Sequence, residues 1–145
     1  MNSPIFNEIV TIVSNKIIAF NTYETIMSSS KISKSILPGQ FINILPNDSW
    51  KNIMRRPMSV ASCNKNLISI IYKIVGSGTD IMSKWKKGDR IDIIGPLGNY
   101  WENFNKEPII IGGGVGIAPI LFLHNHLREK SINHHMIMGA RNKKE

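Results

Sequence analysis

Cysteine is nearly absent from this sequence, and long apolar runs are missing altogether. Among its 145 residues only Cys63 carries a thiol, so neither an intrachain disulfide nor a cluster held by four thiolates can form within it. No apolar stretch reaches the roughly 18 residues of a membrane-spanning helix. Residues 1–10 contain Glu8 and lack the basic start and apolar centre of a secretory signal. We therefore expect a cytoplasmic protein that does not enter a membrane.

Acidic residues are also scarce, with 10 against 18 lysines and arginines, and the formal net charge is +8. Such a balance is one sign of nucleic-acid binding. The lysines are scattered, however, and lysine, isoleucine and asparagine are abundant throughout, which indicates a general bias in residue usage. We expect no nucleic acid among the partners and assign the charge to anionic cofactors or to an acidic partner surface.

The first hundred residues read as a series of short β-strands. A single short helix is predicted at residues 80–86, where Ile81, Met82 and Trp85 share one face. Several short strands with one helix indicate an antiparallel barrel or sandwich. The strands are predicted by β-branched and aromatic runs or by alternation at residues 8–13, 17–20, 22–27, 41–45, 67–75 and 90–94, and another begins near residue 56.

The pattern changes near residue 104, so we place a domain boundary between residues 1–103 and 104–145. Residues 108–111 form a short apolar strand of the kind buried on both faces of a parallel sheet. A glycine run, a helix at residues 117–130 and a strand at residues 134–139 complete one β-α-β unit. A sheet this small is marginal, and a complete doubly wound domain needs several more strands. Either the chain is a fragment or another chain covers the exposed surface.

A cation, a fixed turn and a hydroxyl follow one another at Arg56-Pro57-Met58-Ser59. The planar guanidinium of Arg56 can bind an anionic group such as pyrophosphate, and Pro57 favours an extended segment. In such a segment Arg56 and Met58 share one face and Ser59 points to the other, unless the strand twists or bulges. The Ser59 hydroxyl can donate to a heteroaromatic nitrogen. The alternative interpretation is a basic turn that leads into an ordinary strand.

Two glycine-containing loops are candidates for phosphate or nucleotide contacts. The loop at residues 76–79 lies between a strand and the short helix, so its amides can face an anion, and Thr79 can cap the helix or bond a phosphate. A plain strand-to-helix turn explains this loop about as well. Residues 112–116 follow a buried strand and open a helix, as a dinucleotide loop does. The match to G-x-G-x-x-G is imperfect, and a tight packing turn is the alternative.

Residues for acid-base or metal chemistry are not gathered in a convincing pattern. Asp89 and Asp92 have no partner at a suitable spacing, and His124 and His126 do not share a helix face. We therefore expect neither catalytic side chains nor a metal site, and we interpret Cys63 as a small buried residue.

Six motifs occur in the order in which the ferredoxin-reductase-like flavoproteins have them. The Arg-Arg-Pro-x-Ser form and the Gly-x-Gly-Thr loop most resemble the dihydroorotate dehydrogenase B electron transfer subunits, and the resemblance covers about residues 5–145. The motifs are Arg56-Pro57-Met58-Ser59, Ile71-Tyr72-Lys73, Gly78-Thr79, Gly95-Pro96-Leu97-Gly98, Gly112-Gly113-Gly114-Val115-Gly116-Ile117-Ala118-Pro119 and Gly139-Ala140-Arg141.

This resemblance implies a six-stranded antiparallel Greek-key barrel that binds FAD, followed by the first part of a Rossmann-like NAD-binding domain. Arg56 would hold the FAD pyrophosphate, Ser59 would face flavin N5, and residues 71–73 would line the flavin and its ribityl chain. The loop at residues 76–79 would bind the phosphates, and residues 112–116 would approach the nicotinamide nucleotide. The implied cofactor-binding residues are Arg56, Pro57, Met58, Ser59, Ile71, Tyr72, Lys73, Gly78, Thr79, Gly112, Gly113, Gly114 and Gly116.

The resemblance also implies electron transfer in pyrimidine biosynthesis. In the family, NAD(H) exchanges electrons with FAD, and a [2Fe-2S] cluster passes them to an FMN-containing dihydroorotate dehydrogenase catalytic subunit in a hetero-oligomer. This sequence departs from the family because the cluster cysteines and most of the NAD domain are absent. Two hypotheses follow. One is an FAD-binding electron transfer subunit, and the other is a truncated FAD-binding remnant without turnover or another flavin reductase-type subunit.

Overall fold

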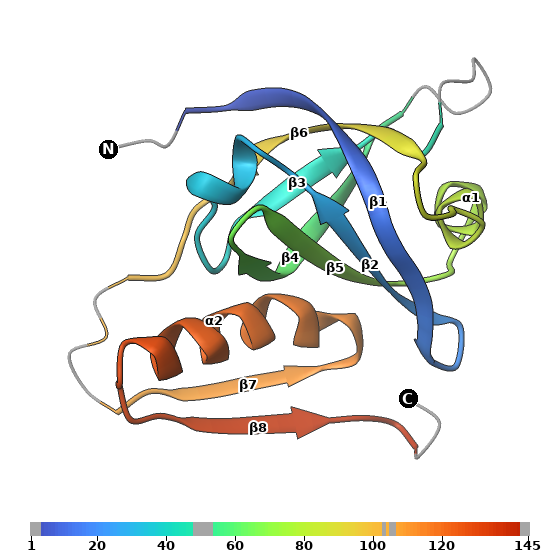
Figure 1. Cartoon of the computed structure of the whole chain (residues 1–145). Helices are drawn as coiled ribbons and strands as arrows, with labels where there is room; N and C mark the ends of the chain where they lie inside the picture. Colours follow the sequence, from blue (N-terminus) through green and yellow to red (C-terminus); the bar gives the residue numbers. More distant parts are fainter. Residues whose placement is uncertain (1–3, 48–53, 103, 105–106, 143–145) are drawn as a thin grey trace.

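Six antiparallel strands close into a barrel in the order β1-β2-β5-β4-β3-β6, which confirms the predicted Greek-key barrel. The computed structural model describes residues 4–47, 54–102, 104 and 107–142. A short 3-10 helix, η1 (Ile32–Lys34), lies near one end of the barrel, and helix α1 (Ser77–Ser83) covers the other (Figure 1). The strands are β1 (Phe6–Ala19), β2 (Thr22–Ser28), β3 (Phe41–Ile44), β4 (Arg56–Asn64), β5 (Leu67–Lys73) and β6 (Arg90–Leu97).

Alternation of side chains explains how β1 joins the barrel. Glu8, Val10 and Ile12 point inward and are buried, whereas the residues between them are exposed. The strand runs unbroken from Phe6 to Ala19, although its composition predicts two separate strands. Its register with β2 shifts between Ile12 and Ser14 and again between Ile17 and Ala19. Between these two shifts the polar residues 14–16 pair regularly with residues 24–26 of β2, so the strand continues through them.

The barrel interior is filled mainly by isoleucine and valine, which suit strands because their branched side chains pack well on a pleated surface. Met82 and Trp85, from α1 and the turn after it, close one end of this core. Ile32 of η1 and Phe122 of the following unit also belong to it. The buried members from the strands are Val10, Ile12, Met27, Ile42, Ile44, Val60, Ile68, Ile70, Tyr72, Ile91 and Ile93.

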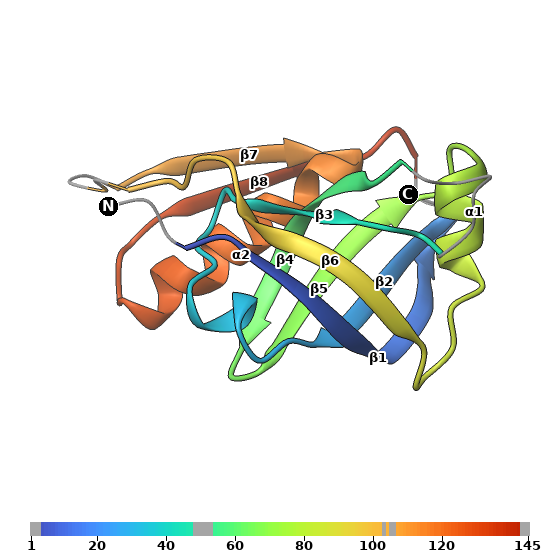
Figure 2. The same ribbon diagram turned by 90° about the horizontal axis from the view of Figure 1, so that it is seen from above.

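The second unit has the predicted β-α-β order. It consists of β7 (Ile109–Gly113), the single turn η3 (Gly114–Gly116), α2 (Ile117–Glu129) and β8 (His135–Gly139). Strands β7 and β8 pair in parallel. Helix α2 lies between this sheet and the barrel, where it packs on β4 (Figures 1 and 2).

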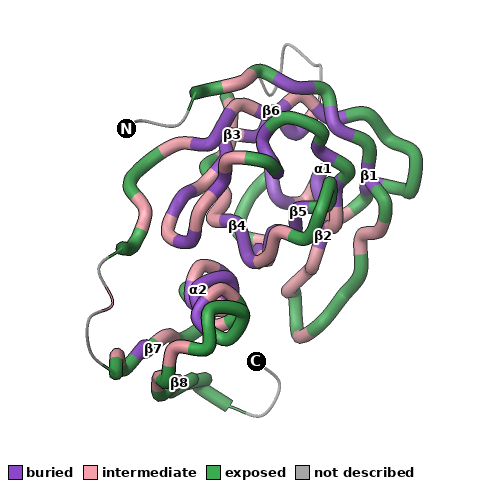
Figure 3. Tube along the Cα trace, turned by 60° about the vertical axis from the view of Figure 1, so that its left-hand side comes forward, coloured by how far each residue is buried: buried purple, intermediate pink, exposed green. Residues whose placement is uncertain are grey.

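The two-stranded sheet is covered on one face only. Ile110 faces α2 and is buried with Leu123 and Leu127, whereas Ile109 and Ile111 are 63% and 68% exposed. Figure 3 shows the contrast between this outer sheet and the buried stretches of the barrel strands. The prediction of a strand buried on both faces is therefore wrong, because α2 covers one face of β7 and no described element covers the other.

Two further expectations concern the domain boundary and membrane-spanning helices. The expected boundary between residues 103 and 104 falls at residue 103, which lies outside the described residues, so the division into domains stays a prediction. Within the described part of the chain, no helix combines the length and the apolar character needed to cross a membrane.

Candidate functional site

Two of the predicted segments meet in one pocket at the α1 end of the barrel. Arg56, Pro57 and Met58 begin β4 and form one wall, and residues 75–79, which join β5 to α1, form the other. Strands β4 and β5 are antiparallel neighbours, so the start of one and the end of the other lie at the same end of the barrel. The pocket has a volume of about 280 Å³.

Arg56 lies directly against Gly78. A Cβ added to Gly78 would stand 2.6 Å from Nε and 3.1 Å from Cζ of Arg56, so any larger residue would push the guanidinium out of its present position. Nη1 of Arg56 donates to the carbonyl oxygens of Met54 at 2.8 Å and of Arg55 at 3.4 Å. The backbone before β4 therefore holds this cation beside the loop that leads into α1.

The hydroxyl of Thr79 is used inside that loop. It accepts hydrogen bonds from the backbone N–H groups of Val75 at 2.9 Å and Gly76 at 3.2 Å, and it donates to the carbonyl of Gly76 at 3.0 Å. These bonds stabilise the start of α1 at Ser77, three residues before the predicted start at Asp80. The structure shows Thr79 bonding back to the start of its own helix, and its contact with a phosphate stays a prediction.

Met58 and Ser59 point to opposite faces of β4. Met58 is paired with Ile42, which is buried, and it packs against the barrel core. Ser59 follows Met58 directly and therefore points to the opposite, outer face of the strand. Its cross-strand partner Phe41 lies on the same face. The predicted alternation of Arg56, Met58 and Ser59 is therefore present in the strand.

The segment at residues 71–73 is divided between the two faces of β5. Tyr72 is 2% exposed inside the barrel, where its ring stacks on Tyr23 with centroids 5.8 Å apart. Burial raises the pKa of Tyr72 to about 12. Ile71 and Lys73 are half-buried and alternate with Tyr72, so they lie on the outer face with Ser59. Of the three residues implied to line a flavin, Tyr72 thus faces the core.

Asn15 in β1 fastens α1 to the barrel, and no sequence motif pointed to it. Its Nδ2 donates toward three carbonyl groups at the C-terminal end of α1, at 3.0 to 3.2 Å. Its Oδ1 accepts hydrogen bonds from Thr25 at 2.7 Å and Tyr72 at 3.3 Å. These partners lie between 10 and 70 residues away in sequence, so no local pattern could have revealed this contact.

Arg55 points away from the pocket, in contrast to Arg56. Its Nη2 donates to Oδ2 of Asp92 at 2.8 Å, and its Nη1 donates to the backbone oxygens of Asp92 at 3.2 Å and Asn43 at 3.5 Å. Asp92 therefore has an ion-pair partner that sequence spacing did not reveal. The two adjacent arginines lie in separate surroundings.

The glycines at residues 112–116 have different local roles. A Cβ on Gly112 would collide with Cδ1 of Ile120, so this glycine lets α2 pack close to β7. Gly114 has a φ of +55°, which favours glycine. Gly116 faces open space at the start of α2. Gly112 therefore has a packing role, and the nucleotide contact of Gly112, Gly113, Gly114 and Gly116 stays a prediction.

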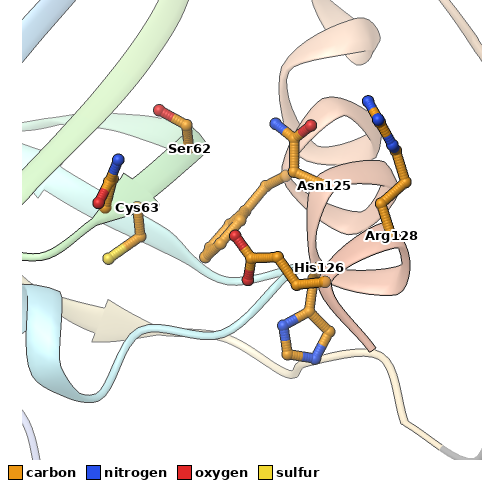
Figure 4. A pocket seen from close by; sticks show the side chains of 8 residues that line it. Ser62, Cys63, Asn125, His126 and Arg128 are labelled. Atoms are coloured by element: carbon orange, nitrogen blue, oxygen red, sulfur yellow. The ribbon is translucent and has the colours of Figure 1, made fainter. Parts of the chain in front are cut away.

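A larger pocket, of about 530 Å³, lies between the end of β4 and α2 (Figure 4). The thiol of Cys63 donates to the carbonyl of Ser33 at 3.1 Å. Burial and, secondarily, the charge of Glu129 raise the pKa of this half-buried thiol, which favours its protonated form. No sequence pattern predicted this pocket. Its labelled side chains are Ser62, Cys63, Asn125, His126 and Arg128.

His124 of α2 meets His134 of the loop before β8. Nδ1 of His124 lies 2.7 Å from Nε2 of His134, whose Nδ1 lies 2.8 Å from the carbonyl of Ile132. Burial, with the neighbouring His134 and Arg128, lowers the pKa of His124. Over the described ranges, no group of three or more histidine, cysteine, aspartate or glutamate residues is placed to hold a metal ion.

Curated sequences similar to this chain carry one name, dihydroorotate dehydrogenase B (NAD(+)), electron transfer subunit. The relative from Fusobacterium nucleatum is 36% identical over 93% of this chain and 54% of its own length. The relatives from Bacillus velezensis and Streptococcus mutans are 34% and 35% identical, over 94% and 96% of this chain and 56% and 55% of their own. The chain thus spans about half the length of the curated relatives it matches. No family model matches it.

Solved structures share the fold. An NADH-dependent reduced ferredoxin-NADP oxidoreductase, described for flavin-based electron bifurcation, has a TM-score of 0.84 and 35% identity over 94% of this chain and 50% of its own. The ferredoxin-NADP+ reductase from Plasmodium falciparum has a TM-score of 0.78 over 95% of this chain and 61% of its own. At 20% identity, the second likeness shows the fold alone.

Proposed function

From the homology of this chain to the dihydroorotate dehydrogenase B electron transfer subunits, we propose that it binds FAD and passes electrons between NAD(H) and a partner catalytic subunit. It would act in cytoplasmic pyrimidine biosynthesis with an FMN-containing dihydroorotate dehydrogenase. The supporting observation is the meeting of Arg56 with the loop at residues 76–79 in one pocket. A pyrophosphate is bound well where a guanidinium and a closely approaching backbone face each other.

The residues of the pocket fit the pyrophosphate of FAD. Arg56 presents a planar set of donors, and the glycine at position 78 leaves beside it a cradle that any Cβ would fill. On the outer face of the barrel, Ser59 would face flavin N5, with Ile71 and Lys73 along the ring and the ribityl chain. When bound, FAD supplies the exchange of two electrons with a nicotinamide and of single electrons with an acceptor.

We assign NAD(H) to the loop at residues 112–116, where Gly112, Gly113, Gly114 and Gly116 would allow close approach of a nucleotide. The iron-sulfur cluster implied by the family does not fit the residues present, because Cys63 is the single cysteine in the sequence. The proposed electron route therefore includes no cluster ligated by this chain. Its own residues bind and orient the cofactors, and we assign none of them to proton transfer.

The alternative function is an FAD-binding module without redox turnover, or a subunit of another flavin reductase-type oxidoreductase. The exposed outer face of the β7-β8 sheet favours this alternative. The unit assigned to NAD(H) is less completely packed than the barrel assigned to FAD. Reduction of a dye by NADH with the purified chain would argue against the module. Orotate formation with a co-purified catalytic subunit would separate the proposed function from other flavin reductases.

FAD binding is tested most directly with the purified chain. We expect flavin absorbance and about one FAD per chain, and we expect Arg56→Ala to raise the Kd for FAD by roughly 10- to 100-fold, as for the loss of charge-assisted hydrogen bonds. Arg90→Ala is the matched control, because Arg90 is an exposed arginine of β6 that does not line the pocket. A colourless protein that takes up no added FAD would overturn the proposal.

A further inference from the structure

The side chains of two adjacent arginines at the start of β4 point in opposite directions. Arg56 lies in the pocket against Gly78, whereas the guanidinium of Arg55 reaches across β3 to Asp92 on β6. The Arg55 and Asp92 side chains are only 23% and 27% exposed. An ion pair this sheltered, with further bonds to two backbone oxygens, holds its arginine more firmly than an exposed surface pair does.

The contacts of Arg55 bear on Arg56 through the backbone. Nη1 of Arg56 donates to the carbonyl oxygens of Met54 and Arg55, so the position of these two carbonyls determines where the guanidinium lies. The side chain of Arg55 fixes the same short segment to β3 and β6. The ladder pairing of Arg56 with Ile44 also holds the start of β4. Loss of the Arg55 attachment would loosen the two carbonyls before it and return rotamer freedom to the long side chain of Arg56.

We propose that the Arg55–Asp92 pair is a positioning clamp that holds Arg56 in the pyrophosphate pocket and thereby strengthens the preference for FAD over flavins that lack a pyrophosphate. This inference rests on the proposed FAD-binding function and deepens it. Asp92 serves as the fixed end of the clamp, because it lies on a central part of β6, paired with Ile9 of β1. Neither Arg55 nor Asp92 lines the pocket itself.

The clamp makes a prediction that a purely structural ion pair does not make. A pair that only supported the barrel would weaken the binding of every flavin alike or would change only the melting temperature. A clamp acting through Arg56 affects the ligand that carries a pyrophosphate, FAD, and spares riboflavin, which carries no phosphate. Its effect also disappears once Arg56 is removed, because there is no guanidinium left to position.

The test measures the Kd values of FAD and riboflavin for the full chain and its variants. We expect Arg55→Met to raise the Kd for FAD roughly three- to tenfold, the order of cost of immobilising one long side chain at binding, and to leave riboflavin unchanged. In the Arg56→Ala background, Arg55→Met should add nothing. Asp92→Asn, which keeps an acceptor but loses the charge, should give a smaller effect of the same kind.

Arg90→Met is the matched control, because it removes an exposed arginine on the same strand as Asp92. If Arg55→Met does not fold, Arg55→Lys and Asp92→Asn carry the same comparison of the two flavins. The clamp is overturned if Arg55→Met binds FAD as the wild type does while Arg56→Ala does not, or if FAD and riboflavin weaken equally. Failure of the wild-type chain to bind FAD would overturn the proposed function as well.

Discussion

The barrel and the β-α-β unit bury their side chains to very different extents. In the closed barrel every strand has two neighbours, and inward residues such as Ile70 are fully buried. In the β-α-β unit two strands share one helix, and its own core cluster contains three buried residues. On the other face of its sheet, Ile111 is 68% exposed.

This difference separates the two candidate cofactor sites. The pocket of Arg56 and Gly78 is built from the barrel and α1, and Asn15 and the Arg55–Asp92 pair fasten its walls to neighbouring strands. The glycine loop at residues 112–116 rests instead on the sparsely packed sheet. We infer that the FAD side is preformed by packing, and that the stability of the NAD(H) side depends on few contacts.

The largest expected effect compares one isoleucine from each region. Ile70→Ala removes a fully buried side chain from the barrel and should lower the free energy of unfolding by about 3 kcal/mol. Ile111→Ala makes the same chemical change on the exposed sheet face and should cost less than about 0.5 kcal/mol. Urea denaturation of both variants measures the difference, and equal losses would show that the two regions are packed alike.

A smaller effect is expected from the glycine that separates α2 from β7. Gly112→Ala places a methyl group against Ile120 and should destabilise the β-α-β unit by about 2 kcal/mol, as overpacking does. Hydrogen exchange of α2 and β8 amides should speed up, while FAD affinity stays unchanged. Gly116→Ala is the control, since its φ of −64° and the open space around it accept a methyl group. Faster exchange throughout the barrel would contradict this separation of the regions.

In the barrel, Gly78→Ala should act on binding rather than on folding. The new Cβ displaces the guanidinium of Arg56 from the loop, so we expect the Kd for FAD to rise roughly tenfold, equivalent to about 1.4 kcal/mol. The matched control is Gly139→Ala on β8, where a new Cβ meets nothing within 4 Å. A fluorescence titration with FAD gives the Kd. Unchanged FAD binding by Gly78→Ala would show that Arg56 does not need its present position.

The smallest effect is a difference in response to acid. The pKa of His124 is lowered below 6.5, so its contribution to stability is complete above pH 6.5 and is lost as the pH falls through the folded-state value. In the barrel, burial alone would raise the pKa of Glu8, but hydrogen bonds from Ser29, Ser30 and Ile32 lower it below 4.5. Its contribution is therefore lost only as the pH falls below 4.5.

Acidification should therefore weaken the β-α-β unit before the barrel. Hydrogen exchange, corrected for intrinsic rates, follows the two regions separately from pH 7 to well below pH 4.5, so that the loss of the Glu8 contribution is also covered. Burial also lowers the pKa of His126 in α2, so His124→Gln should reduce the less acidic step, which begins below pH 6.5. Glu8→Gln should remove only the more acidic step. Simultaneous loss of protection in both regions at every pH would refute this order.

Sequence patterns predicted those features that depend on neighbours along the chain. Alternation identified the barrel strands, and the order of short motifs identified the segments of Arg56 and Gly78 that meet in the pocket. The same patterns could not show that the Thr79 hydroxyl caps its own helix or that Tyr72 faces the core, because each residue type is compatible with either environment. Asn15 and the partner of Arg55 were missed because their contacts join strands distant in sequence.

Phe122 has a consequence for the design of a minimal flavin-binding module. Its ring belongs to the second unit by sequence but to the barrel core by packing. A fragment that ended at Leu97 would lose this ring and expose apolar surface on β4, which α2 now covers. The smallest scaffold engineered from this protein should therefore retain α2. If α2 is removed, the apolar surface of β4 that it covers has to be made polar.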